Sequence, residues 1–163
     1  MDKKTMNKKT AMTVLTIIVV AAIFMGFLLV NKGDGPVTGM ILADRAIENV
    51  ETYSNDVQTH GDGIYLVVSN AFNKFEEDYK AEILESKDLY ATIHFVECPK
   101  GSEYTGKWIK DGNVVQEDNG ILLTGPEGVI SYLLEGDSAV KGSYTFELYE
   151  GDRKIFEKTF SIE

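Results

Sequence analysis

Cysteine and proline are scarce in this chain of 163 residues, which contains one Cys and three Pro. Because Cys98 is the only thiol, no disulfide can form within the chain, and a folded domain must be stabilised by its hydrophobic core. The apolar content of 44% excludes a disordered chain, since disordered chains have too little apolar surface to form a core. The length leaves room for about one domain, which excludes a multidomain enzyme.

Motifs that carry catalytic or metal chemistry are absent from the sequence. There is no G-x-G-x-x-G after a strand, no G-x-x-x-x-G-K-[ST], no G-x-S-x-G and no H-E-x-x-H. The two histidines, His60 and His94, have no cysteine or carboxylate partners at a zinc-binding spacing. Cys98 stands in HFVECPKG, which does not resemble the cysteine motif of sortases, and an extended strand would place it about 13 Å from His94. We therefore expect neither catalysis nor a bound cofactor.

Basic side chains are also few, with 16 Lys and Arg against 26 Asp and Glu and a net charge of −10. Setting aside Asp2 and the four lysines of residues 3–9 leaves 12 positive and 25 negative side chains. Because phosphate-binding surfaces need clustered Lys and Arg, we expect no nucleic-acid partner. An acidic domain is compatible with binding cations or basic partners, and also with a surface charge that only keeps the protein soluble. Binding of Ca²⁺ by aspartates in turns is one option, and none of these aspartates has the D-x-D-x-D-G spacing of a calcium-binding loop. The candidates are Asp34, Asp62, Asp111, Asp118, Asp137 and Asp152.

One long apolar run is present, AMTVLTIIVVAAIFMGFLLV at residues 11–30. A helix of this length spans about 30 Å, the thickness of bilayer hydrocarbon. Lysines precede the run, whereas Lys32 and Asp34 after it cancel, so the positive-inside rule places the N-terminus in the cytoplasm. The apolar core is longer than that of a cleaved signal peptide, and no A-x-A site follows, which favours an uncleaved anchor. We expect a cytoplasmic tail, a transmembrane helix, a tether and an extracellular β-sandwich domain at residues 1–10, 11–30, 31–40 and 41–163.

The sequence between residues 41 and 86 gives mixed indications. Residues 41–53 have apolar side chains at helical spacing, but IENVETY within them suits a first strand equally well, so both alternatives stay open. IYLVV at residues 64–68 lies between turn residues and predicts a strand. A helix is expected next, because four apolar side chains share one helical face: Phe72, Phe75, Tyr79 and Ile83. Carboxylates in the same segment could serve a hydrolase, but their helical spacing is typical of a solvated face: Glu76, Glu77, Asp78 and Glu82.

From residue 89 onward, short runs rich in Val, Ile, Tyr, Phe and Thr alternate with turn residues, which predicts a β-domain. In residues 89–97 the apolar side chains have a period of two, so one face should be buried while Tyr90 and His94 point outward. Asp111-Gly112 and Gly151-Asp152 predict tight hairpins. Further strands are expected at 120–124 and 128–134. Strands this short, with no room for crossover helices, favour an antiparallel sandwich.

The order of three segments is similar to that of the immunoglobulin superfamily: residues 89–98, then Trp108 in YTGKWIKDG, then Tyr144 in GDSAVKGSYTF. In that family a packing tryptophan on strand C and a corner tyrosine on strand F follow strand B, and Trp108 and Tyr144 match these two. The chain departs from the family at the disulfide, because Phe146 follows two positions after Tyr144. The resemblance, which extends to membrane-anchored bacterial and archaeal cell-surface domains, covers about residues 89–163. It implies an immunoglobulin-like sandwich with a binding or structural role.

These observations predict a mainly β protein, in which an antiparallel immunoglobulin-like sandwich follows one transmembrane helix, with room for one short extra helix. Alternation makes Tyr90 and Tyr149 candidate contact residues. The first functional hypothesis is a single-pass extracellular module that binds a protein or surface ligand, or is structural, without catalysis. The alternative is an accessory subunit that docks through its membrane helix and membrane-proximal region onto a transporter, a secretion system or an envelope enzyme. The oligomeric state stays open, including a covalent dimer through Cys98. The expected structural core contains Trp108, Tyr144, Phe146 and Phe160.

Overall fold

The structure is a computed structural model that describes residues 35–72, 74–85 and 87–163. The expected transmembrane helix at residues 11–30 lies outside these residues. Within the part that is described, no helix is both long and apolar enough to cross a membrane. The described elements are β1 (Val37–Ala43), α2 (Val50–Thr59), β2 (Ile64–Ala71), β3 (Lys74–Lys80), β4 (Leu89–Phe95), β5 (Glu103–Lys110), β6 (Asn113–Leu122), β7 (Gly128–Leu134), β8 (Gly142–Glu150) and β9 (Arg153–Ile162).

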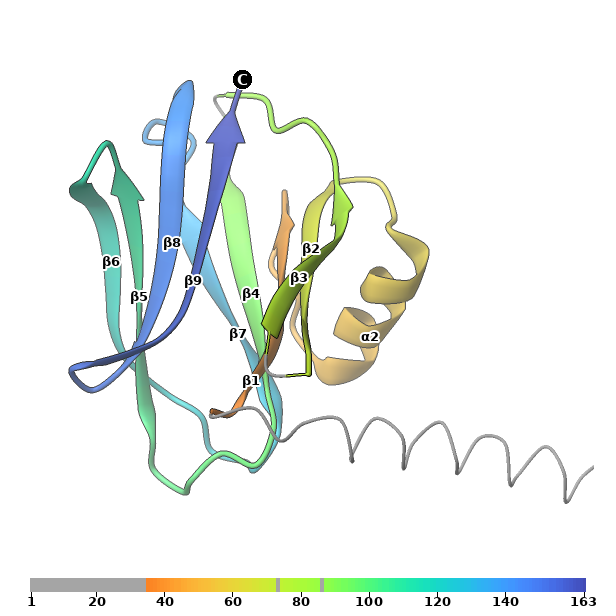
Figure 1. Cartoon of the computed structure of the whole chain (residues 1–163), viewed down its shortest axis with the longest axis vertical. Coiled ribbons are helices and arrows are strands. Elements are labelled where there is room, and N and C mark those ends of the chain that lie inside the picture. Colours follow the sequence, from red (N-terminus) through yellow and green to blue (C-terminus); the bar gives the residue numbers. More distant parts are fainter. Residues whose placement is uncertain (1–34, 73, 86) are drawn as a thin grey trace, which may run out of the picture.

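The strands form two sheets that pack face to face (Figure 1). Sheet A has the strand order β3-β2-β1-β4-β7, and sheet B has the order β6-β5-β8-β9. Every neighbouring pair of strands is antiparallel. Along β5, β7 and β8, buried side chains alternate with less buried ones, so each strand turns one face toward the opposite sheet. The expected antiparallel sandwich of a mainly β protein is confirmed.

The core between the sheets is rich in aromatic side chains. Trp108 of β5 and Phe146 of β8 are fully buried, and their rings meet edge to face with centroids 4.9 Å apart. Phe160 of β9 approaches Trp108 in the same way at 6.1 Å and stacks on Tyr144 at 5.9 Å. Buried aromatic pairs of this kind stabilise a fold beyond the burial of their area. The core therefore provides the stability that a disulfide provides in many small extracellular domains.

The helix expected from residue 72 is wrong, because the segment forms the second arm of a β-hairpin. β3 pairs with β2 through the partners Ala71 and Lys74, so Phe72 lies in the turn, 88% exposed, instead of on a buried helical face. The carboxylates expected on a solvated helix therefore lie on or beyond an edge strand, where Glu77 pairs with Lys158 of β9.

A β-bulge explains the misleading spacing of the aromatic residues in β3. The register steps from Val67 opposite Tyr79 to Val68 opposite Glu77, which leaves Asp78 as the extra residue. A bulge rotates the strand, so residues on its two sides no longer follow one alternation. Phe75 consequently meets Phe156 of sheet B edge to face at 4.7 Å, whereas Tyr79 stacks on His60 outside the sandwich at 4.6 Å.

The first strand begins before the expected boundary of the sandwich. β1 starts at Val37, which is 3% exposed, although residues 31–40 were expected to form a tether. Of the two alternatives for residues 41–53, the helix is right only from Val50, where α2 begins. The strand over IENVETY, residues 47–53, is wrong, because β1 ends at Ala43. Asn49 caps the helix by accepting a hydrogen bond from the backbone N–H of Thr52 at 2.8 Å, which satisfies one of the free donors at the helix start.

The expected hairpins and several expected strands are confirmed. β5 and β6 meet at Asp111 and Gly112, whose φ angles of 50° and 81° suit a two-residue turn with left-handed backbone at both positions. Gly151, with a φ of 57°, lies in the corresponding turn between β8 and β9. The expected strands 64–68 and 128–134 lie in β2 and β7. The separate strand expected at 120–124 is wrong, because its first residues complete β6.

Candidate functional site

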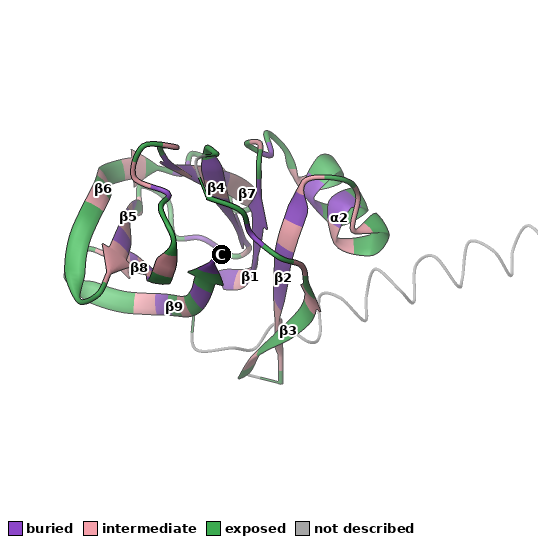
Figure 2. Ribbon diagram, turned by 90° about the horizontal axis from the view of Figure 1, so that it is seen from above, coloured by how far each residue is buried: buried purple, intermediate pink, exposed green. Residues whose placement is uncertain are grey.

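α2 lies against the outer face of sheet A (Figures 1 and 2). Tyr53, 6% exposed, is the most buried apolar side chain that the helix places on this face, and Val57 of the helix packs there as well. The expectation that His94 points to solvent is wrong, because it is 3% exposed beneath the helix. The second face of β4 is thus buried as well. A small apolar cluster surrounds Tyr53 there and contains Ile41, Ala43, Ile47, Ile64 and Val67.

Four polar or aromatic side chains meet at this interface, and we call them the His94 cluster: Thr38, Tyr53, His94 and Glu127. The hydroxyl of Thr38 on β1 is hydrogen-bonded to Nδ1 of His94 at 2.5 Å. On the other side of the ring, Nε2 lies 3.3 Å from Oε1 of Glu127, which precedes β7. The ring of Tyr53 stacks on the imidazole with centroids 5.0 Å apart and planes inclined by 26°. Side chains from three separate segments therefore converge on one imidazole of β4.

Burial controls the protonation of this cluster. Removal from water lowers the pKa of His94, and the nearby carboxylate of Glu127 only partly opposes that shift. Glu127 is 54% exposed, so its charge is screened by solvent. Burial likewise raises the pKa of the Tyr53 hydroxyl, and the charge of Asp78 raises it further. Near neutral pH the imidazole is therefore uncharged and Tyr53 is protonated.

A hydroxyl, an imidazole and a carboxylate in a row are the components of a nucleophilic triad. In this cluster, however, the imidazole is 3% exposed and Tyr53 covers one of its faces, so a substrate has no direct approach to the base. A general base must come within hydrogen-bond reach of the proton that it removes. We interpret the cluster as a structural contact in which a hydrogen bond from β1, a ring stack from α2 and the carboxylate before β7 meet on β4.

A second polar contact fixes α2 through Asp56, which is buried on the same side of the helix as Tyr53. Asp56, 6% exposed, accepts hydrogen bonds from Arg45 at 3.2 Å to each carboxylate oxygen. The same guanidinium donates to the carbonyl of Asp62 at 2.8 Å. Arg45 thereby ties the loop before the helix to the helix and to the turn after it. Because Arg45 is 41% exposed, part of this ion pair remains solvated.

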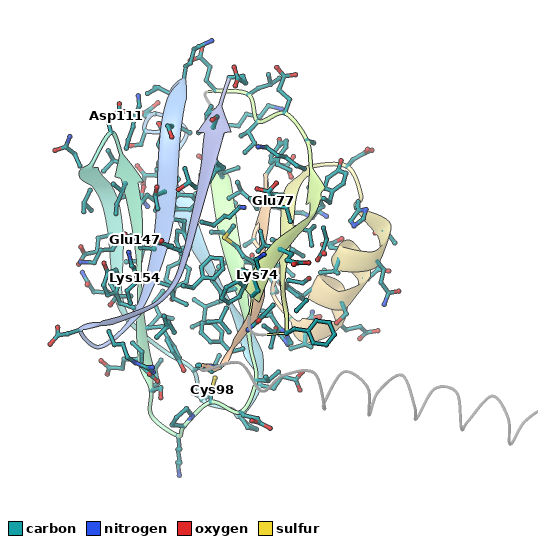
Figure 3. All side chains as sticks on the ribbon, in the orientation of Figure 1. Lys74, Glu77, Cys98, Asp111, Glu147 and Lys154 are labelled. Carbon is teal, nitrogen blue, oxygen red and sulfur yellow. The ribbon has the colours of Figure 1, made fainter. Side chains whose placement is uncertain are left out.

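The two candidate contact residues lie on opposite outer faces of the sandwich. Tyr149 is on the outer face of sheet B, where its hydroxyl donates to Glu147 at 2.6 Å and the ammonium of Lys107 lies 5.0 Å from its ring centroid. Lys154 bonds the other oxygen of Glu147 at 3.0 Å, and Figure 3 shows these two side chains together. Tyr90 is half-buried on sheet A, between its strand partners Ala43 and Leu133. They do not form one surface.

Cys98 is buried beside the start of β5, 8% exposed. The hydroxyl of Tyr104 donates to its sulfur at 3.5 Å, and burial raises the pKa of the thiol. His94 and Cys98 are not in hydrogen-bond contact. Across residues 35–72, 74–85 and 87–163, no three His, Cys, Asp or Glu side chains converge as metal ligands would.

Comparison with known proteins gave no family model, no curated protein and no solved structure that matches the chain.

Sequence reasoning did not find three members of the His94 cluster, Thr38, Tyr53 and Glu127. They come from segments far apart in the chain, and no short motif joins them. It also misjudged Phe72, which it placed on a buried helical face. The Phe-Asn pair between two extendable runs was the available indication of a turn there, since Asn tolerates a positive φ.

Proposed function

We propose that this chain is a single-pass, membrane-anchored extracellular module that binds a protein or surface ligand and has no catalytic activity. The observation that carries the proposal is the uncharged run at residues 11–30, followed after six residues by the first strand of a sandwich. A cytoplasmic N-terminus and an exported sandwich follow from the lysines that precede the run. The absence of catalytic motifs from the sequence favours binding over chemistry.

The strand order supports an immunoglobulin-like sandwich. If β1, β4 and β7 are strands A, B and E, then β6, β5, β8 and β9 are C′, C, F and G, in the order that such sandwiches use. Trp108 then lies on strand C and Tyr144 on strand F. The hydroxyl of Tyr144 lies 2.7 Å from the carbonyl oxygen of Ser138 and 2.8 Å from that of Val140 and donates its one proton back to this loop, as a corner tyrosine does. β2 and β3 would be an added hairpin at the edge of the A strand.

The outer face of sheet B is the surface best suited to a partner. α2 covers part of the corresponding face of sheet A, whereas on sheet B the partly exposed ring of Tyr149 lies among charged side chains whose exposure ranges from 14% for Glu147 to 41% for Lys154. Tyrosine with neighbouring ionic groups can give both apolar contact and hydrogen bonds. We propose this face, centred on Tyr149, Lys107 and Glu147, as the binding surface.

Membrane topology is the first test of the proposal. A membrane-impermeant amine reagent applied to intact cells should modify Lys141, whose side chain is 74% exposed, as identified by mass spectrometry. Lys3 and Lys4 should be modified only after lysis, which makes them the matched control in the same molecule. Modification of the N-terminal lysines in intact cells, or protection of Lys141, would overturn the proposed orientation.

The accessory subunit is the second candidate, supported by the small residues Ala21, Ala22 and Gly26 in the apolar run, which permit close helix packing. Its other element, the region around residues 43–79, is less favourable, because Tyr53, Ile64 and Val67 are already packed against one another between α2 and sheet A. Docking would then depend on residues 11–30. Replacement of that run by an unrelated apolar helix of equal length should preserve an independent binding module, and should abolish co-purification of an accessory subunit with its complex.

A further inference from the structure

Phe72 is a large apolar side chain that the sandwich does not use. It is 88% exposed at the tip of the β2–β3 hairpin, whereas the other exposed large apolar side chains of the described residues are 40% to 52% exposed. Its backbone has a φ of 53°, in the left-handed region. A bulky side chain in that conformation is uncommon, since its Cβ crowds the following carbonyl. Neither packing nor turn geometry accounts for phenylalanine here.

A second hairpin of the same kind shows what such a turn normally requires. Asp111, at the tip of the β5–β6 hairpin, has a φ of 50° and is followed by Gly112. Asp and Gly are residues that tolerate this backbone. Both turns join antiparallel strands with the same spacing between the paired residues, Ala71 with Lys74 and Lys110 with Asn113. The difference between them is the exposed aromatic ring.

The Phe72 turn lies at the end of the sandwich where the chain enters it. The amide of Asn70 donates to the carbonyl of Val37, the first residue of β1, at 3.3 Å. Only residues 31–36 separate Val37 from the apolar run, and six extended residues reach at most about 20 Å. If residues 11–30 span a bilayer, this end must stay close to its surface. Figure 3 places Asp111 at the opposite end of the sandwich.

We infer that Phe72 inserts into the interfacial layer of the bilayer that holds residues 11–30, and so forms a second attachment point. This inference rests on the proposed function. Aromatic rings favour the boundary between headgroups and acyl chains. The acidic sandwich disfavours anionic lipid, so the partner is a zwitterionic surface such as phosphatidylcholine. The two attachments hold the sandwich with the Phe72 turn toward the lipid and the Asp111 turn away from it.

Fluorescence quenching in vesicles tests this arrangement on the full chain. The protein contains one tryptophan, Trp108, which is fully buried and provides a constant background. The variants Phe72→Trp and Asp111→Trp would be reconstituted into phosphatidylcholine vesicles with and without bromine on the acyl chains near the headgroup. The added indole at position 72 should lose about half of its emission or more to brominated lipid, and the one at position 111 should lose almost none.

Vesicle flotation, measured first, distinguishes failure of the membrane anchor at residues 11–30 from failure of Phe72 insertion. Protein that floats but is not quenched at position 72 overturns the inference and leaves the anchor intact. A blue-shifted but unquenched indole at position 72 also overturns it, because a protein contact would then cover the residue. Equal quenching at positions 72 and 111 shows that no orientation is fixed and overturns it as well. Protein that does not float with vesicles overturns both the anchor and the inference.

Discussion

The ring of Tyr53 lies on the imidazole of His94, with centroids 5.0 Å apart and planes inclined by 26°. Tyr53 comes from α2, and His94 comes from β4, which lies near the centre of sheet A. Because Tyr53 is the buried apolar side chain of the helix, this stack is a main contact between α2 and the sandwich. It also keeps the imidazole out of water, which has a measurable consequence for stability.

Folding stability should fall as the pH drops below neutrality because of His94. Its folded-state pKa is lowered by burial, partly offset by Glu127, so below about pH 6.5 the unfolded chain binds a proton more readily than the folded one. The contribution of this site is therefore complete above the unfolded-state pKa and is lost as the pH falls toward the folded-state value. Thr38 and Tyr53, the other side chains around the ring, carry no charge near neutral pH.

Urea unfolding of the sandwich, residues 35–163, between about pH 7.5 and pH 5 measures this dependence. His94→Gln should flatten the dependence of unfolding free energy on pH over this range. An unchanged slope in the His94 variant would show that the imidazole is not held neutral by the fold.

Removal of the hydroxyl group should lower folding stability at one buried tyrosine, Tyr144, but not at another, Tyr132. The Tyr144 hydroxyl donates its one proton to the carbonyls of Ser138 and Val140, which share it, and accepts from the N–H of Val140 at 3.1 Å. Tyr144→Phe should therefore cost about 1 to 2 kcal/mol. Among the described residues, the buried Tyr132 hydroxyl has no hydrogen-bond partner. Tyr132→Phe should then be neutral or stabilising. Thermal unfolding of both variants is the measurement, and an equal loss in the two would contradict the hydrogen-bond assignments.

Much of the sandwich could be read from the sequence because its determinants are local. The alternation at residues 89–97 and the turn at Asp111 and Gly112 each lie within a few neighbouring positions. The β-bulge at Asp78 could not be read in this way, since it gives a strand the apolar spacing of a helix. The pairing with β2 decides its structure, and periodicity alone does not encode that pairing.

The candidate site was harder to predict than the fold. Alternation correctly places His94 on the face of β4 that points away from sheet B. Whether that outer face is in contact with water or with protein depends on the position of α2, which the alternation of β4 does not show. The partners of His94 come from β1, α2 and the segment before β7, and local sequence does not show that they meet. Phe72 was misjudged because an aromatic residue in a periodic pattern is usually buried, and its exposure follows from the turn.

Close packing at Gly106 should make it intolerant of a side chain. A Cβ at this buried position would overlap the ring of Tyr132 from the opposing sheet. Gly106→Ala should therefore destabilise the sandwich by about 1 to 3 kcal/mol, as overpacking does. Gly61→Ala is the control, because the nearest atom there is 3.9 Å from the added Cβ, and it should change stability by less than about 0.5 kcal/mol. Similar midpoints of urea unfolding for the two variants would contradict the close approach of sheets A and B at this point.

The thiol of Cys98 should be nearly unreactive in the folded protein. It is 8% exposed, and burial raises its pKa, so little thiolate is available to attack a disulfide reagent. Labelling with a chromogenic aromatic disulfide should be about 100-fold slower in the native protein than in urea. A cysteine at the exposed position of Lys100, in a Cys98→Ala background, should react quickly in both states. Rapid native labelling, or a disulfide-linked dimer under mild oxidant, would show that the Cys98 loop opens.

Phe72 and Phe75 differ by three positions and should differ sharply in their contribution to stability. Phe75 packs edge to face on Phe156 with centroids 4.7 Å apart, so Phe75→Ala should cost about 2 kcal/mol in residues 35–163. Phe72→Gly removes a ring that is 88% exposed and relieves a positive φ, so stability should be unchanged or up to about 1 kcal/mol higher. A loss of more than about 1 kcal/mol in Phe72→Gly would mean that the ring packs within the sandwich, whereas a retained or raised stability leaves its exposed position to be explained by a partner outside the fold.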